Sequence, residues 1–191
     1  MFQSKEMEDC RFIKKEYQKG IFQHGSFHHC RFENCDFTES DFTATKFLDC
    51  QFFDCNFSLT KIGGCKFQDV CFARCKFVGV NFCQIDPMIL GLRFKSCLMK
   101  TCNFSDLNLN KTSFEGSDIR EAYFINSHAA GTNFSKSNLQ GSLFHNADLQ
   151  KADFREAQNY DINPLTNKIK KAKFSIPEAY SLLEHLEIII R

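Results

Sequence analysis

The residues best suited to chemistry lie near the N-terminus, where three histidines and a cysteine fall within seven positions. His24, His28, His29 and Cys30 belong to residue types that bind zinc. A shared metal ion requires these side chains to converge on one point. The repeat described below places the three histidines at outward positions and Cys30 in the core, so the sequence predicts no metal site here.

Eleven cysteines would ordinarily suggest disulfide bonds or metal binding. Nine of them occupy one position of a short repeat, which elsewhere holds serine, threonine or alanine. The nine are Cys10, Cys30, Cys35, Cys50, Cys55, Cys65, Cys75, Cys97 and Cys102. Such a column indicates buried packing, in which cysteine acts as a compact apolar side chain. We therefore expect free thiols and a reducing cytoplasmic location.

The repeat that sets these positions is a large apolar residue, usually phenylalanine, at every fifth place. It runs from Phe12 to Phe82 and resumes from Phe94 to Phe154, and all but three of the 23 phenylalanines obey it. A period of five fits neither a helix, with about 3.6 residues per turn, nor a strand, with about two. Short fixed repeats of this kind are typical of solenoids, whose coils bury their centres only against one another.

The remaining composition excludes several function classes. A net charge of +1 gives no global attraction to nucleic acid or to an acidic membrane. No apolar run approaches the roughly 18 residues needed to span a bilayer, so no membrane partner is expected. We find no nucleophile–base pair, phosphate-binding loop or paired carboxylates, and a filled rod offers no cleft for them. The sequence therefore predicts a protein that is not an enzyme and needs no cofactor.

Two consecutive units, Ala147–Lys151 (ADLQK) and Ala152–Glu156 (ADFRE), resemble the A(D/N)LXX unit of pentapeptide-repeat proteins. The resemblance implies an all-β solenoid, a right-handed quadrilateral β-helix with four units per coil and about seven coils. We assign residues 1–158 to this β-helix. Residues 159–191 form the expected C-terminal extension, which contains a short capping and dimerisation α-helix.

The C-terminal segment resembles the ending of Qnr-type quinolone-resistance proteins and McbG-type immunity proteins. Ser175 and Glu178 have the spacing of a capping box, which predicts the start of a helix, and an apolar stripe follows. In that family the helix joins two rods end to end, so the resemblance implies a homodimer. The expected interface residues are Ile176, Tyr180, Leu182, Leu183, Leu186, Ile188 and Ile190. The alternative is a monomer whose helix only covers the last coil.

A register break at residues 83–93 interrupts the repeat. Phe82 and Phe94 are twelve positions apart, which corresponds to two units and two extra residues. One interpretation is a kink or small protrusion that presents apolar side chains to a partner. The other is a bulge whose aliphatic side chains fill the core. The residues at the break are Asp86, Pro87, Met88, Ile89 and Leu90.

The Qnr-type resemblance implies a non-enzymatic DNA mimic that binds a bacterial type II topoisomerase, DNA gyrase or topoisomerase IV, and protects it from quinolone-like or peptide poisons. Acidic bands at residues 30–60 and 115–161 would supply phosphate-like charge, although a basic belt at residues 61–111 separates them. The candidate partner-binding residues are Glu33, Asp36, Glu39, Asp41, Asp49, Asp54, Asp118, Asp148 and Asp153.

Two interpretations of the acidic bands remain open. They could imitate DNA phosphates, or they could be merely a solvated surface. The protein would then be an interaction scaffold with no topoisomerase role, because the repeat determines architecture and not function. Direct binding of nucleic acid is not expected, since the repeat predicts no exposed aromatic side chain beside the basic belt.

Overall fold

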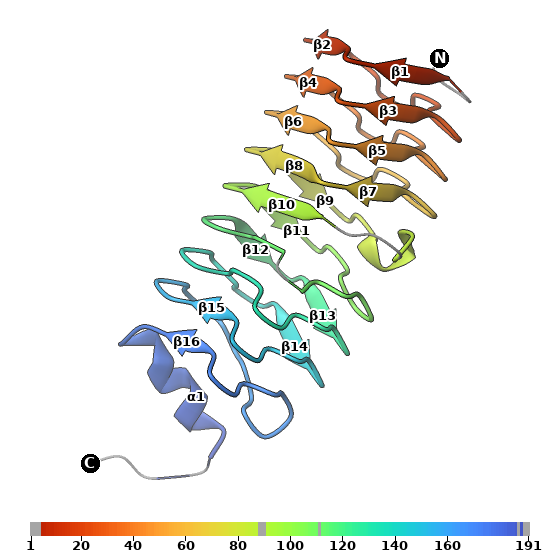
Figure 1. Cartoon of the computed structure of the whole chain (residues 1–191). Helices are drawn as coiled ribbons and strands as arrows, with labels where there is room; N and C mark the ends of the chain where they lie inside the picture. Colours follow the sequence, from red (N-terminus) through yellow and green to blue (C-terminus); the bar gives the residue numbers. More distant parts are fainter. Residues whose placement is uncertain (1–4, 88–90, 111, 187, 189–191) are drawn as a thin grey trace.

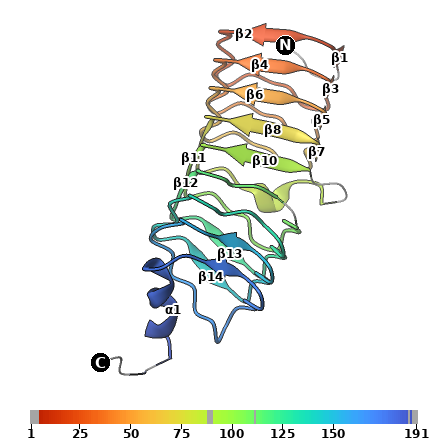
Figure 2. The same cartoon turned by 60° about the vertical axis from the view of Figure 1, so that its left-hand side comes forward.

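The chain winds into a right-handed, four-sided parallel β-solenoid of about 8 turns with one short helix at its C-terminal end (Figure 1). The structure is a computed structural model that describes residues 5–87, 91–110, 112–186 and 188. The two chain ends lie at opposite ends of the rod, as a second view also shows (Figure 2). Among the described helices, none has the length and hydrophobicity that a bilayer crossing requires. The cytoplasmic location stays a prediction.

Each side of the rod is a ladder of short parallel strands, and we name the sides after one of their strands. The β1 side contains β1 (Glu6–Glu8), β3 (Ser26–His28), β5 (Lys46–Leu48) and β7 (Lys66–Gln68). The β2 side contains β2 (Arg11–Ile13), β4 (Arg31–Glu33), β6 (Gln51–Phe53), β8 (Val70–Ala73), β10 (Leu92–Lys95), β15 (Asp153–Phe154) and β16 (Lys173–Phe174). The β9 side contains β9 (Lys76–Val78), β11 (Leu98–Lys100) and β12 (Asp118–Arg120), and the β13 side contains β13 (Tyr123–Ile125) and β14 (Leu143–His145). Isolated bridges continue each ladder between the named strands.

Pairing between neighbouring coils has a constant step. Phe32 lies opposite Phe52, and Phe52 opposite Phe72, so that one coil contains four units of five residues. The pairing continues beyond residue 158, because β15 pairs with β16 in register. The solenoid therefore has about 8 turns rather than the expected seven. The proposed domain boundary at residue 158 stays a prediction.

The register break changes this step once. Phe72 lies opposite Phe94, and Phe77 opposite Met99, so the coil that crosses the break is two residues longer than the others. A 3₁₀ turn, η1 (Phe82–Gln84), precedes the break, and the side chain of Ile85 is buried. Asp86 forms an ion pair with Lys66 at 3.2 Å, and Pro87 is exposed. Met88, Ile89 and Leu90 lie outside the described residues, and a protrusion there stays a prediction.

The core consists of stacked rings. On the β2 side nine rings form one column with centroid separations between 4.6 and 5.2 Å. They belong to Phe12, Phe32, Phe52, Phe72, Phe94, Phe114, Phe134, Phe154 and Phe174. Rings on adjacent sides meet edge to face, as Phe47 and Phe52 do at 5.4 Å. In the C-terminal half phenylalanine alternates with aliphatic residues, so rings on two opposite sides pack against Met99, Ile119 and Leu139 on a third.

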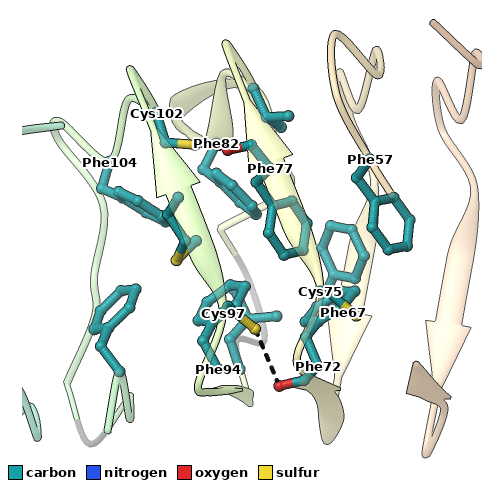
Figure 3. Packing of buried hydrophobic residues seen from close by; sticks show 14 of the residues in the cluster. Phe57, Phe67, Phe72, Cys75, Phe77, Phe82, Phe94, Cys97, Cys102 and Phe104 are labelled. Atoms are coloured by element: carbon teal, nitrogen blue, oxygen red, sulfur yellow. Dashed lines mark hydrogen bonds between the residues drawn. The ribbon is translucent and has the colours of Figure 1, made fainter. Parts of the chain in front are cut away.

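The repeat position that holds cysteine, serine, threonine or alanine, which we call the small-residue column, also forms hydrogen bonds between coils. The Cys65 thiol donates to the Phe42 carbonyl of the preceding coil at 2.8 Å, and the Thr132 hydroxyl donates to the Leu109 carbonyl at the same distance. Cysteine, serine and threonine thus link consecutive coils from inside (Figure 3). All eleven cysteines, each a described residue, are free. Burial raises the pKa of the Cys50 thiol to about 12, so this thiol stays protonated at neutral pH.

Corners of the rod share one unusual backbone conformation. At the described corners the residue two places after a core centre has a positive φ, except Gln84, which lies in the 3₁₀ turn η1. The position holds glycine, as at Gly64 and Gly79, or a larger residue such as Leu59 (58°) or Asp54 (54°). This left-handed conformation costs a non-glycine residue about 1–2 kcal/mol. The backbone N–H at the corner offsets part of this cost, since Leu59 N donates to Val78 O at 2.8 Å.

The C-terminal helix differs from the expectation. A 3₁₀ turn, η2 (Glu178–Tyr180), comes first, and α1 (Ser181–Glu184) is a single helical turn. The predicted capping box is wrong, because neither η2 nor α1 has a side-chain cap and the Ser175 hydroxyl accepts a hydrogen bond from Glu156 N at 3.1 Å. Ser175 therefore closes the last coil instead of starting a helix.

Truncating a core ring tests the stacked column. We expect Phe134→Ala or Phe72→Ala to lower the free energy of unfolding by roughly 3–5 kcal/mol, because the cavity lies between two fixed rings. Phe53 provides the control, since its ring lies outside the core beneath Arg31. Phe53→Ala should cost less than about 1 kcal/mol. Denaturant titration followed by circular dichroism measures both, and equal costs would contradict the packing described here.

A glycine substitution tests the corner conformation. Leu59→Gly should raise the free energy of unfolding by about 0.5 kcal/mol, because relief of the left-handed strain exceeds the added chain entropy. Leu98 is also exposed but lies in strand β11, where Leu98→Gly should lower stability by about 1 kcal/mol. Opposite signs in thermal unfolding are the expected result, and destabilisation by both would show that the corners carry no such strain.

Candidate functional site

The histidine and cysteine cluster does not converge on a shared point. His24 lies on the β13 side, whereas His28 and His29 lie on the β1 side. His28 contacts the Ser26 hydroxyl at 2.8 Å, and the Cys30 thiol donates to the His28 carbonyl at 3.3 Å inside the coil. Within the described part of the chain, no three His, Cys, Asp or Glu side chains are placed to hold a metal ion.

The nine acidic residues predicted to bind a partner are distributed over all four sides of the rod. Glu33, Asp54 and Asp153 belong to the β2 side, and Asp36, Glu39 and Asp118 to the β9 side. Asp41 belongs to the β13 side, and Asp49 and Asp148 to the β1 side. Within the described residues, these nine acids therefore do not form one acidic face, although they fall in two acidic bands of the sequence.

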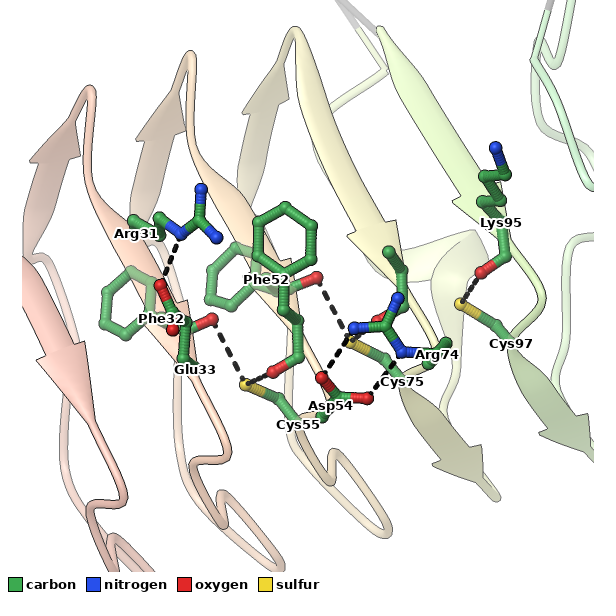
Figure 4. Close-up of polar contacts among 12 residues, drawn as sticks. Arg31, Phe32, Glu33, Phe52, Asp54, Cys55, Arg74, Cys75, Lys95 and Cys97 are labelled. Atoms are coloured by element: carbon green, nitrogen blue, oxygen red, sulfur yellow. Dashed lines mark hydrogen bonds and ion pairs between the residues drawn. The ribbon is translucent and has the colours of Figure 1, made fainter.

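Arginines neutralise four of these acids: Arg120 donates to both oxygens of Asp118 at 2.7 and 2.6 Å, and the other three are Glu33, Asp54 and Asp153. Arg11 and Arg31 both donate to the Glu33 carboxylate, and the hydrogen bond from Arg11 is the main reason why the pKa of Glu33 is lowered. Arg74 donates to both oxygens of Asp54 at 2.7 Å, and this contact lowers the pKa of Asp54 (Figure 4). Arg155 lowers the pKa of Asp153 in the same way. These carboxylates stay ionised but present little free negative charge.

Two further acids hold turns of the backbone. Asp36 accepts hydrogen bonds from the backbone N–H and the hydroxyl of Thr38, and Asp41 accepts from the backbone N–H of Thr43. Burial opposes ionisation of both carboxylates, but the hydrogen bonds outweigh it and lower the pKa of Asp36 and of Asp41. An Asp or Asn before the core residue with Ser or Thr after it is the sequence signal for this turn. Applied to the sequence, that signal would have shown that Asp36 and Asp41 bind their own backbone turns.

The C-terminal turn leaves several apolar side chains in solvent. Its inner face is anchored by His185, which contacts Asp161 at 2.7 Å, and by Leu182, which packs against the core. The exposed fractions on the outer face are 74% for Ile176, 56% for Tyr180, 39% for Leu186 and 54% for Ile188. Together with Leu183, these four residues form what we call the apolar end surface. Ile190 lies outside the described residues.

The charge pattern that sequence reasoning missed runs across coils. Arg11, Arg31 and Arg93 occupy the same position of the repeat on the β2 side; Arg11 and Arg31 lie on adjacent coils, and Arg93 lies three coils beyond Arg31. When charges are grouped by position along the chain, as acidic bands and a basic belt, the shared repeat position of these arginines is not visible. Grouping them by coil step would have revealed it, because residues one coil apart are neighbours in space.

Comparisons with known proteins agree with this geometry. The family described as "Pentapeptide repeat region" matches residues 25–98 and 92–174. No curated protein matches the chain by sequence. HetL, a pentapeptide repeat protein involved in heterocyst differentiation regulation from the cyanobacterium Nostoc sp. strain PCC 7120, is 11% identical with a TM-score of 0.67, over 91% of this chain and 86% of HetL.

A second solved structure extends over nearly the whole rod. A trypsin-treated variant of QnrB1, a plasmid-mediated fluoroquinolone resistance protein, is 19% identical with a TM-score of 0.56, over 97% of this chain and 100% of QnrB1. At these identities both comparisons concern the fold. The family match covers most of the chain and coincides with the coils around the phenylalanine core, and this protein is therefore a member of the pentapeptide-repeat family.

Proposed function

We propose that this protein binds a bacterial type II topoisomerase, DNA gyrase or topoisomerase IV, and protects it from quinolone-like or peptide poisons. The observation that carries the proposal is the likeness to QnrB1 along 97% of the chain. A rod whose described coils are filled with core side chains suits a binding protein. The protein would act by occupying the enzyme's surface and not by modifying the poison.

Of the four sides, the N-terminal half of the β1 side is best suited to imitate a DNA backbone. Asp9, Asp49 and Asp69 are exposed corner residues on this side and follow one another at intervals of one or two coils. His29 lies between Asp9 and Asp49, at 3.9 and 3.7 Å. A row of exposed carboxylates would be attracted to the basic DNA-binding surface of a topoisomerase.

The apolar end surface would join two rods. Exposed Ile176, Tyr180, Leu186 and Ile188 at the terminus of a soluble solenoid favour burial against a second copy. The resulting homodimer would place the two N-terminal halves at opposite ends of one long rod.

A scaffold with no topoisomerase role is the second candidate. The observation that favours it is the pairing of Glu33, Asp54 and Asp153 with arginines, which reduces the negative charge available for mimicry. Such a scaffold would use the same rod to hold a different protein partner.

A supercoiling assay tests the leading proposal. The purified protein should restore supercoiling by DNA gyrase, or relaxation by topoisomerase IV, in the presence of a fluoroquinolone. The triple variant Asp9→Asn, Asp49→Asn, Asp69→Asn should lose this protection. The control variant Asp106→Asn, Glu121→Gln, Glu156→Gln removes as many acids from positive-φ corners of other sides and should retain it. Absence of rescue and of enzyme binding by the unaltered protein would leave the scaffold as the function.

Light scattering tests the dimer. Leu186→Asp should convert dimers into monomers, because the charge would be buried against the second copy. Leu98→Asp is the matched control, since Leu98 in the middle of the rod and Leu186 are both 39% exposed. Leu98→Asp should leave the dimer unchanged. A monomeric unaltered protein would identify the helix as a simple cap.

A further inference from the structure

The N-terminal half of the β2 side carries a strip of exposed cations. We name it the cationic strip; it consists of Arg11, Lys14, Arg31, Arg74, Arg93 and Lys95, all exposed. Among the described residues, the carboxylates on these five coils of the β2 side are Glu33 and Asp54, and Glu115 follows on the next coil. We propose that the cationic strip binds the phosphate backbone of duplex DNA, independently of any topoisomerase.

The two carboxylates lie beneath the cations. The Glu33 side chain is only 16% exposed, whereas the Arg11 and Arg31 side chains that contact it are 60% and 47% exposed. The Asp54 side chain is 38% exposed, and Arg74 above it is 60% exposed. Each acid therefore fixes its arginines while the guanidinium groups form the outermost layer, as Figure 4 shows for Arg31 and Arg74. The charge that a ligand meets first on this surface is positive.

The remaining cations are open to a ligand. Lys14, Arg93 and Lys95 have no ion-pair partner among the described residues. Arg93 lies opposite Cys71 on the preceding coil and Ser113 on the following one, so small uncharged side chains are its neighbours in the ladder. Lys95 lies opposite Ala73 on the preceding coil; the register places Glu115 opposite it on the following coil, but the two side chains form no ion pair.

The strip has the regular spacing of one sheet. Its cations project from strands β2, β4 and β10 and from the corners that follow β2 and β8, within one continuous five-stranded sheet. Five strands at about 4.8 Å spacing cover about 19 Å, which matches five or six base pairs of duplex at about 3.4 Å each. Four of the six cations are arginines, whose planar guanidinium groups suit paired contacts with phosphate oxygens.

Duplex DNA suits the strip better than a single strand does. Single-stranded nucleic acid is typically held by aromatic side chains that stack with bases. Phe53 is the aromatic residue on the outside of this sheet, and the Arg31 guanidinium covers its ring at 4.3 Å. The ring is thus unavailable to a base, whereas phosphate contacts need no ring. The inference revises the expectation that the protein has no direct contact with nucleic acid.

Fluorescence anisotropy with a labelled duplex of about two helical turns tests the proposal, with the whole chain and no topoisomerase present. At about 50 mM salt the protein should bind, and affinity should fall steeply with salt. The variant Lys14→Gln, Arg93→Gln, Lys95→Gln should bind roughly 100-fold more weakly, and its slope of log affinity against log salt should be shallower by about 2 to 3. Circular dichroism verifies that the solenoid persists, because these exposed side chains make no core contact.

The matched control removes three exposed lysines from the other three sides. Lys46→Gln, Lys61→Gln, Lys76→Gln changes the net charge equally and should bind DNA almost as well as the unaltered protein. Equal loss in both variants would show that only net charge matters and would overturn the site. Failure of the unaltered protein to bind the duplex would overturn it as well. Tighter binding of polyglutamate than of DNA would also overturn it and would identify an acidic polypeptide as the occupant.

Discussion

The in-register stacking of one coil on the next is the constraint on which the rest of this structure depends. Strands in a sheet are about 4.7–4.9 Å apart, and the rings of the β2 column are separated by 4.6 to 5.2 Å. One spacing thus satisfies backbone hydrogen bonds and ring stacking together. A residue inserted within a coil would disturb both, which is why the extra residues between Phe82 and Phe94 are confined to one coil. The stacking resumes immediately afterwards, with Phe94 on Phe72.

Each coil also needs residues that turn its corners and donors that form hydrogen bonds with its inward-facing carbonyl groups. The left-handed residue after each core centre turns the corner at a local cost, and the thiol or hydroxyl before the next core centre donates to the coil below. Cys65 and Thr132 are equivalent in this role, which explains why cysteine, serine and threonine exchange in one column. The nine cysteines of this column are therefore mainly structural. Reactivity is disfavoured where burial raises the thiol pKa, as for Cys102, to about 12.

The core and the corners repeat from coil to coil. The features that distinguish this protein from other rods of the same fold are therefore its outward side chains and its two ends. The outward residues form ladders that run across coils, and each side of the rod has its own charge. The β1 side begins with exposed carboxylates, whereas the β2 side places arginines over the carboxylates that fix them. A rod with opposite charge on adjacent sides can contact a basic protein surface and an acidic nucleic acid at once. The topoisomerase proposal and the cationic strip are therefore compatible but separable.

The sequence by itself determined a solenoid and the buried cysteine column, because a strict period of five leaves one large and one small residue per unit to be buried. The four-sided coils were expected from the resemblance to pentapeptide-repeat proteins, and the C-terminal helix from the resemblance to Qnr-type proteins and the apolar stripe after residue 175. Only the tertiary structure decided which charges are neighbours, since Arg11 and Glu33 meet by stacking across a coil and not by proximity in sequence. It also corrected the start of the helix, because the Ser175 hydroxyl bonds to Glu156, a partner in the previous coil. Local patterns predict what repeats, whereas the pairing of surface residues depends on the coil step, which becomes visible only when the coils are stacked.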